Sequence, residues 1–129
     1  MATLDDIAQL VADLPESEEA DRRGTRTWSV GGKTFAWERL FSKADIKRFG
    51  TAPIPSQPIV AFRVADQTDK EAVLAQGHSG VFTIEHFNGF NAVLVELEEV
   101  EPSVLAELVE DAWLALAPPR VVDDWRAAR

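Results

Sequence analysis

The sequence predicts an α+β fold, in which a largely antiparallel sheet is flanked by helices within a single domain. The chain has 129 residues, which suits one domain, and 46% of them are hydrophobic, which is enough to support a core. Short β-rich segments with tight turns alternate with amphipathic helical segments, a pattern typical of this class. No linker, internal repeat or low-complexity tract divides the chain, so residues 1–129 are interpreted as one domain.

The first expected element is a helix over Thr3–Leu14. Thr3 can cap its start, Asp5 and Asp6 suit the positive end of the helix dipole, and Pro15 marks its end. Its apolar residues recur at helical spacing and predict one buried stripe, made of Ile7, Leu10, Val11 and Leu14.

A β-hairpin is expected next, within Arg22–Arg39, because Gly31-Gly32 permits the positive φ angles of a two-residue turn. In this register Trp28 faces Phe35 and Arg26 faces Trp37, where the guanidinium would lie over the indole ring. One face would then carry the apolar side chains as part of the core, namely Val30, Trp28, Phe35 and Trp37. A slip of one residue would move them to the opposite face.

Caps and turns place the remaining elements. Ser42 can cap a short helix over Lys43–Phe49 that Gly50 closes, and Pro102 suits the first turn of a long helix to Ala117. The other expected elements are a strand at Ile59–Val64, a helix from about Thr68 to Gln76, strands at Val81–Phe87 and Ala92–Leu97 joined at Asn88-Gly89, and an amphipathic tail with Trp125.

Charge is distributed unevenly along the chain, whose formal net charge is −9. Residues 66–129 hold four basic and thirteen acidic side chains, which accounts for the whole acidic excess. Residues 22–48 hold eight basic and two acidic side chains, a local charge of +6. An acidic protein would repel a polyanion, but this basic segment keeps a polyanionic partner feasible.

The sequence carries no signature of catalysis, a cofactor or a metal site, so we do not expect an enzyme. Without cysteine the chain has no disulfide, thiolate metal site or cysteine nucleophile. The two histidines lack metal-binding spacing. His78 is expected at an exposed turn, whereas His86 is expected to pack within a strand, where it alternates with Phe82 and Ile84.

A membrane partner is not expected either. The N-terminal residues lack the basic start of a secretory signal, and no apolar run approaches the roughly 20 residues of a membrane span. We therefore expect a cytoplasmic protein.

The basic hairpin and the helix after it form the candidate binding site. The side chains expected to contact phosphate are Arg22, Arg23, Arg26, Lys33, Lys43, Lys47 and Arg48. The predicted partner is duplex DNA, bound without strong sequence preference; if about five phosphates are neutralised, log K should fall with log salt at a slope of roughly −4 to −5. Exposed aromatic residues could instead stack on the bases of a single strand.

Several blocks, in order, resemble the MmcQ/YjbR-like family. They begin with Leu14-Pro15 before acidic residues and continue in Thr27–Ala36, His86–Phe90 and the strand Ala92–Leu97. They close with Asp111-Ala112-Trp113 and Ala117–Val121, so the blocks span nearly the whole chain.

The resemblance implies a compact YjbR-like α+β domain, described as a double-wing fold and similar in outline to type III secretion chaperones. It also implies DNA binding, a label such proteins commonly carry by structural analogy. Members often have a basic residue near the positions of Glu96 and Pro119, so this chain's C-terminal face is a poor surface for nucleic acid. The alternative function is protein–protein interaction, in which the acidic helix 102–117 or an exposed sheet face holds a basic or amphipathic partner.

Overall fold

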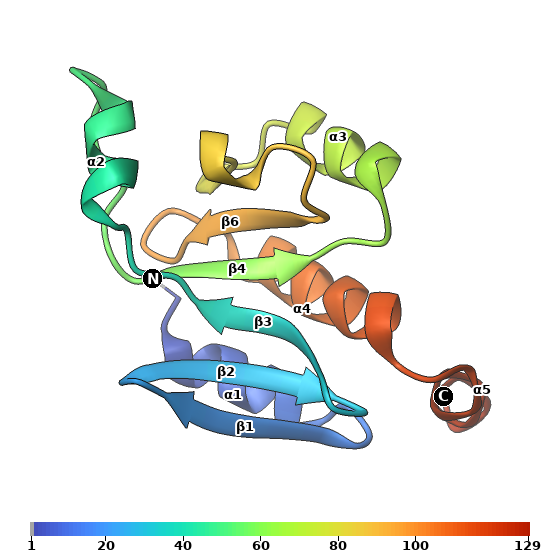
Figure 1. Ribbon diagram of the computed structural model, residues 1–129. Coiled ribbons are helices and arrows are strands. Elements are labelled where there is room, and N and C mark those ends of the chain that lie inside the picture. Colours follow the sequence, from blue (N-terminus) through green and yellow to red (C-terminus); the bar gives the residue numbers. More distant parts are fainter. Residues whose placement is uncertain (1) are drawn as a thin grey trace.

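The computed structural model describes residues 2–129 and contains a six-stranded antiparallel sheet, which confirms the predicted α+β class (Figure 1). The strands lie side by side in the order β1-β2-β3-β4-β6-β5. Their bounds are Ser17–Arg22 for β1, Thr25–Val30 for β2, Lys33–Glu38 for β3, Ile59–Arg63 for β4, Val81–Phe82 for β5 and Ala92–Glu96 for β6.

The helices lie close to their predicted positions. Thr3 and Ser42 each form a capping box at the start of their helices, as the sequence indicated for both caps. The helix bounds are Leu4–Ala12 for α1, Lys43–Phe49 for α2, Gln67–Ala75 for α3, Pro102–Leu116 for α4 and Pro119–Ala127 for α5, with a 3₁₀ turn, η1, at Glu85–Phe87. Within residues 2–129, no helix is both long and apolar enough to traverse a lipid bilayer.

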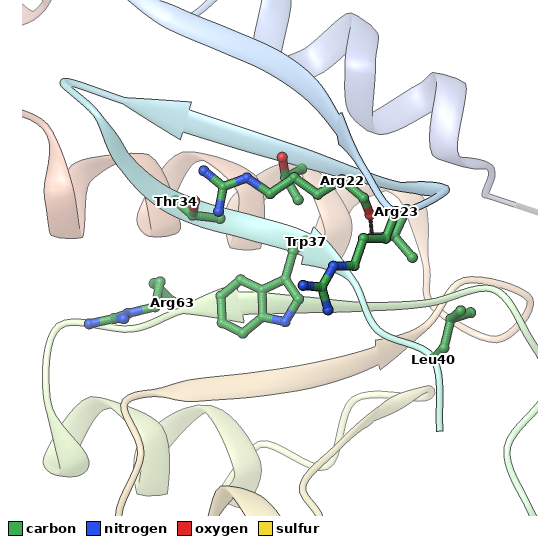
Figure 2. A pocket seen from close by; sticks show the side chains of 8 residues that line it. Arg22, Arg23, Thr34, Trp37, Leu40 and Arg63 are labelled. Atoms are coloured by element: carbon green, nitrogen blue, oxygen red, sulfur yellow. Dashed lines mark hydrogen bonds between the residues drawn. The ribbon is translucent and has the colours of Figure 1, made fainter. Parts of the chain in front are cut away.

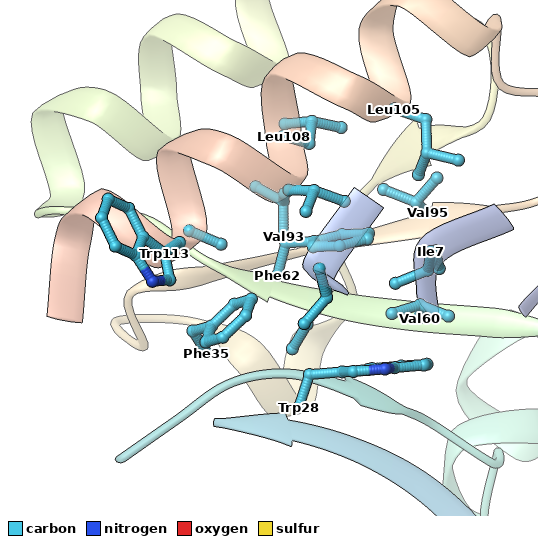
Figure 3. Close-up of a cluster of buried hydrophobic side chains, with 14 of the residues drawn as sticks. Ile7, Trp28, Phe35, Val60, Phe62, Val93, Val95, Leu105, Leu108 and Trp113 are labelled. Carbon is cyan, nitrogen blue, oxygen red and sulfur yellow. The ribbon is translucent and has the colours of Figure 1, made fainter. Parts of the chain in front are cut away.

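The main core lies between one face of the sheet and helices α1 and α4 (Figure 3). Both tryptophans of this layer, Trp28 on β2 and Trp113 on α4, are fully buried. Other members come from all of the central strands and both helices: Ile7, Phe35, Val60, Phe62, Val93, Val95, Leu105 and Leu108. Burial of this apolar surface is the dominant force that holds the two helices against the sheet.

A smaller apolar cluster covers only part of the opposite face. Phe87 of η1 packs on the outward side chains of β4 and β6, together with the partly buried Trp37 and Phe82. Over β1, β2 and β3, this face carries no helix among residues 2–129 (Figure 1). One half of the sheet is therefore open on the side away from α1 and α4, and we call it the open face.

The predicted turn at Gly31-Gly32 is confirmed, but the register beyond it is not. A β-bulge gives β3 one extra residue opposite the Trp28–Ser29 step, so Trp28 pairs with Ala36 and Thr27 pairs with Trp37. The bulge lets the consecutive residues Phe35 and Ala36 both enter the main core. The expectation that Trp37 shares the face of Trp28 is therefore wrong.

The first strand was not predicted. β1 is mostly exposed and polar, so it has no apolar alternation to reveal it. It pairs along its full length with β2 through a tight turn at Arg23 and Gly24, both with positive φ angles of 56° and 84°. Arg22 and Arg23 consequently lie at a turn of the sheet, close to β2.

The strand predicted over Val81–Phe87 is also shorter than expected. Only Val81 and Phe82 pair with β6, and the chain then turns into η1. His86 is exposed on this turn, so the expectation that it packs within a strand is wrong. His78 begins the turn before β5, as predicted, but it is partly buried rather than exposed, with its ring nitrogen 2.6 Å from Oε1 of Gln76.

Candidate nucleic-acid interface

A hollow of about 730 Å³ lies on the open face (Figure 2). Six structural segments contribute to it: the end of β1, the β1–β2 turn, strands β2, β3 and β4, and the chain just after β3. Its lining residues are Arg22, Arg23, Thr25, Thr27, Thr34, Trp37, Leu40 and Arg63. Among residues 2–129, no carboxylate lines this hollow, and the polar side-chain groups that do are guanidinium groups, hydroxyl groups and the indole N–H of Trp37.

Trp37 occupies the middle of the hollow (Figure 2). It is half-buried and lies on β3, a strand paired on both sides by β2 and β4. Its ring centroid is 6.3 Å from that of Phe87 and 6.1 Å from that of Phe90. These aromatic neighbours fix the indole in place on the sheet, while part of its surface remains exposed to solvent.

Three arginines surround this indole. Figure 2 shows Arg22 and Arg23 reaching over the sheet from the end of β1 and the β1–β2 turn, with Arg23 and Arg63, at the end of β4, on opposite sides of Trp37 and Arg22 near Thr34. The guanidinium carbon of Arg63 lies 5.0 Å from the centre of the Phe90 ring, a cation–π arrangement. None of the three forms an ion pair within the described residues 2–129. Their positive charges are therefore not neutralised by the protein.

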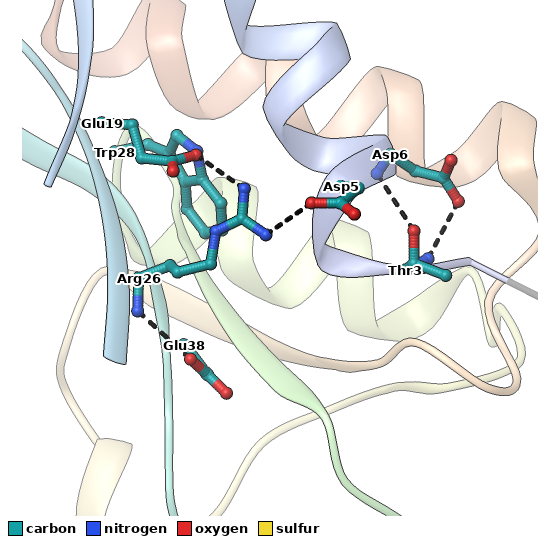
Figure 4. Close-up of polar contacts among 7 residues, drawn as sticks. All are labelled: Thr3, Asp5, Asp6, Glu19, Arg26, Trp28 and Glu38. Atoms are coloured by element: carbon teal, nitrogen blue, oxygen red, sulfur yellow. Dashed lines mark hydrogen bonds and ion pairs between the residues drawn. The ribbon is translucent and has the colours of Figure 1, made fainter. Parts of the chain in front are cut away.

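Arg26, by contrast, lies on the helix side of the sheet (Figure 4). Its guanidinium is 2.8 Å from Asp5 of α1 and 3.0 Å from Glu19 of β1, and it lies over Trp28 at 5.6 Å rather than over Trp37. Hydrogen bonds to Glu19 and then to Asp5 raise the pKa of Arg26 above its ordinary value. The structure thus gives Arg26 a role in joining α1 to the sheet.

The other predicted cations do not share one surface with the hollow. Arg48 is 3.8 Å from both Asp45 and Glu85. Lys33 is exposed at the β2–β3 turn, the end of β2 opposite to Arg22 and Arg23. The exposed Lys43 and Lys47 lie on α2, outside the residues that line the hollow.

Sequence reasoning missed two members of the site. Arg63 was overlooked because it ends an apolar strand, far from the basic segment in sequence. Trp37 was assigned to the core because the bulge in β3 leaves no mark in the hydrophobic pattern. The pairing of Phe62 with Ala36 brings Arg63 beside the start of β3, a proximity that only the strand order reveals.

A buried carboxylate next to the open face has a structural role. Asp45 is 3% exposed, and its Oδ2 accepts hydrogen bonds from Ser42 N and Arg39 Nη2, both at 2.9 Å. Burial acts to raise the pKa of Asp45, but hydrogen bonds from Ser42 and the charge of Arg39 outweigh it and lower the pKa overall. This group ties the start of α2 to the end of β3.

A buried lysine holds the loop that carries the aromatic neighbours of Trp37. Lys70 is 5% exposed, and its Nζ donates hydrogen bonds to the carbonyl oxygens of Phe87 at 2.6 Å and Phe90 at 2.9 Å. Burial lowers the pKa of Lys70. The loop over residues 87–90 is therefore fixed by an internal cation, which in turn positions the rings beside Trp37.

Metal-binding side chains do not cluster in the part of the chain that the structure describes. Among residues 2–129, no group of three or more histidine and carboxylate side chains is arranged to hold a metal ion. Asp111 lies near other acids on and beside α4; burial first, and then the charges of Glu110, Glu107 and Asp69, raise its pKa.

The architecture defines a class: small α+β proteins with one antiparallel sheet, helices packed on one face and a half-open second face. Comparison with known sequences gives the family. The chain belongs to the YjbR family, whose model matches residues 12–115, as the sequence resemblance indicated.

Relatives share the full length of the chain. It is 42% identical over 130 residues to the uncharacterized protein Rv2570 of Mycobacterium tuberculosis (strain ATCC 25618 / H37Rv) and, at the same level, to Mb2600 of Mycobacterium bovis. Each comparison covers 98% of this chain and 98% of the relative. The crystal structure of Deinococcus radiodurans protein DR2400, domain DUF419, is similar with a TM-score of 0.60 at 24% identity, over 88% of this chain and 78% of that one. The similarity to this crystal structure supports the assignment of the fold.

Proposed function

We propose that this YjbR family member is a cytoplasmic DNA-binding protein, without enzymatic activity, that holds the phosphate backbone on its open face. The observation that carries the proposal is the set of three arginines around Trp37, none of them neutralised by a carboxylate within residues 2–129. Guanidinium groups are well suited to phosphate because their donors match its oxygens in a planar fork.

The arrangement also explains how a chain with net charge −9 could bind a polyanion. Exposed charges farther apart than about 8 Å are largely screened at physiological salt, so the local field of the hollow counts more than the net charge. The acidic excess belongs to residues 66–129, and Arg63 is the last cation before it.

The number of free cations sets the expected salt dependence. Arg26 and Arg48 are paired with carboxylates, and the exposed Lys33, Lys43 and Lys47 lie outside the hollow. We therefore count Arg22, Arg23 and Arg63 as the contacts. Three neutralised phosphates on a duplex give a slope of log K against log salt of about −2.7, shallower than the −4 to −5 predicted from sequence.

The test is a titration of fluorescently labelled duplex DNA at several low salt concentrations. The double variant Arg22→Gln/Arg23→Gln should weaken binding and reduce the slope by about two. The matched control is Arg126→Gln/Arg129→Gln, which removes the same charge from the exposed C-terminal end of the chain, where Arg126 lies in the last turn of α5 and Arg129 is 3.6 Å from Glu110. Loss of binding in both double variants alike, or in neither, would contradict a site on the open face.

The alternative partner, a protein bound through the acidic side of α4, stays a prediction. Six residues of α4 are buried against the sheet and α1, so only its acidic outward side is available to a partner. A partner captured by wild type but lost on Glu107→Gln/Glu110→Gln, with DNA binding absent, would favour this alternative.

A further inference from the structure

We infer that the hollow binds unpaired bases, with Trp37 as the stacking surface, so that the preferred ligand is a single-stranded nucleic acid. This inference rests on the proposed function and narrows it to one class of ligand. It is carried by the position of Trp37 in the middle of a basic hollow on a broad sheet face.

The geometry of the sheet opposes a duplex at this indole. Neighbouring strands lie about 4.8 Å apart, so β1 to β4 span roughly 14 Å between their axes. A major groove about 12 Å wide admits a helix or a two-stranded ribbon, but not four strands side by side. Trp37 lies on β3, the third of these four strands, and is therefore out of reach of stacked bases inside a duplex.

An unpaired base has no such restriction. Every base has a flat π-face that can stack on an aromatic ring, and Trp37 offers a half-buried indole held by Phe87 and Phe90. A rigid ring loses little conformational freedom on binding, which favours stacking. The hollow of about 730 Å³ leaves room for a base together with its sugar and phosphate.

The arginines complete the site on both sides of the ring. Arg23 and Arg63 lie on opposite sides of Trp37, and Arg22 extends toward Thr34 (Figure 2), which places cations where the backbone would enter and leave. Thr25, Thr27 and Thr34 also line the hollow. The hydroxyls of Thr25 and Thr27 donate to the carbonyl oxygens of Arg22 and Ala20. Thr34 is the lining hydroxyl that we expect to meet a base edge, and because a hydroxyl can both donate and accept a hydrogen bond it does not select one base.

The experiment compares three oligonucleotides of equal length: a single strand, the same strand in a duplex, and the same strand with abasic sites replacing the bases. The natural and abasic single strands also carry the same number of phosphates, whereas the duplex carries twice as many. Wild type should bind the single strand about 5- to 100-fold more tightly than the abasic strand, the range that one stacked base provides. Trp37→Leu should abolish this difference, while its affinity for the abasic strand stays unchanged. Circular dichroism and thermal unfolding check that the variant is folded.

Two results separate the failure of this inference from failure of DNA binding itself. Equal affinity of wild type for the single strand, the duplex and the abasic strand, with a salt slope retained, would overturn base stacking and leave phosphate binding intact. Absence of binding to all three at low salt would overturn both. Because the comparison of natural and abasic strands uses wild type, it remains decisive even if Trp37→Leu does not fold. A second variant, Trp37→Phe, should retain part of the preference because a smaller ring still stacks.

Discussion

Replacing Asp45 by asparagine should destabilise the protein at neutral pH, because it removes a buried charge that three neighbours share. Its Oδ2 is 2.9 Å from both Ser42 N and Arg39 Nη2, and its Oδ1 is 3.8 Å from Arg48. An amide can keep the hydrogen bonds but not the charge. A charged hydrogen bond contributes about 1–1.5 kcal/mol more than a neutral one, and a carboxylate in the first helical turn contributes about 0.3–1 kcal/mol. We therefore expect Asp45→Asn to lower the free energy of unfolding by about 1.5–2.5 kcal/mol.

The loss of stability in Asp45→Asn should depend on pH, and the direction of this dependence follows from the lowered pKa of Asp45. Its pKa is lowered in the folded state, so the carboxylate stabilises the fold fully above its ordinary pKa of 3.8. This stabilisation is lost as pH falls through the lower, folded-state pKa. The difference between wild type and Asp45→Asn should thus be constant from pH 7 to pH 5 and shrink toward pH 3.

Urea unfolding followed by circular dichroism at pH 7, 5 and 3 measures these differences. The matched control is Asp66→Asn at the exposed N-cap of α3, where Asp66 accepts a hydrogen bond from the backbone of Asp69. Asparagine caps helices about as well as aspartate, so the control should change stability little. A loss below about 0.5 kcal/mol at pH 7 for Asp45→Asn, or a loss as large at pH 3 as at pH 7, would refute the reasoning.

Three further predictions concern other elements. A Cβ on Gly80, whose φ is +80°, would lie 2.7 Å from Glu96 O, so Gly80→Ala should lower the urea midpoint of unfolding. The control is Gly77→Ala, where φ is +67° but the space around the new Cβ is open, and its midpoint should fall much less. Equal losses in the two variants would contradict a clash at Gly80. Lys70→Met leaves two carbonyl oxygens without their donor and should lower the free energy of unfolding by about 1–3 kcal/mol. Because burial lowers the pKa of Lys70, the difference in stability between wild type and Lys70→Met should widen as pH rises toward 10.5. A difference that narrows over this range would contradict the prediction. The folded-state pKa of Asp111 is raised, so its ionised form destabilises the fold at pH 7, and Asp111→Asn should raise Tm there by about 1–3 °C. This gain should vanish below pH 3.8, where the carboxyl group is protonated in both states. A lower Tm at pH 7 would contradict the prediction.

Local signals were sufficient for the helices and for the first turn of the hairpin. Caps at Thr3 and Ser42 and the turn at Gly31-Gly32 are contacts between residues a few positions apart, so their chemistry can be read in a short window. The polar strand β1 had no such signal. The bulge opposite Trp28 had none either, because it depends on how Phe35 fits beneath the helices.

The candidate site could be predicted in part for the same reason. Arg22 and Arg23 were identified by their position in a basic segment, and both line the hollow. Arg26 belongs to the same segment, yet its side chain lies on the other face of the sheet, where Asp5 and Glu19 neutralise it. Closeness in sequence therefore did not predict closeness in space.

Arg26 differs from the three arginines of the hollow in the face of the sheet on which its side chain lies. The helix side brings carboxylates from α1 and β1 within 3.0 Å of Arg26, so its charge is used to hold the fold together. The open face offers Arg63 an aromatic ring at 5.0 Å and no carboxylate among the lining residues within residues 2–129. A stacked guanidinium keeps its charge and its edge donors available, which a paired one does not. Because strand residues alternate between faces, the bulge that moves Trp37 to the open face also places its indole among the arginines that remain free.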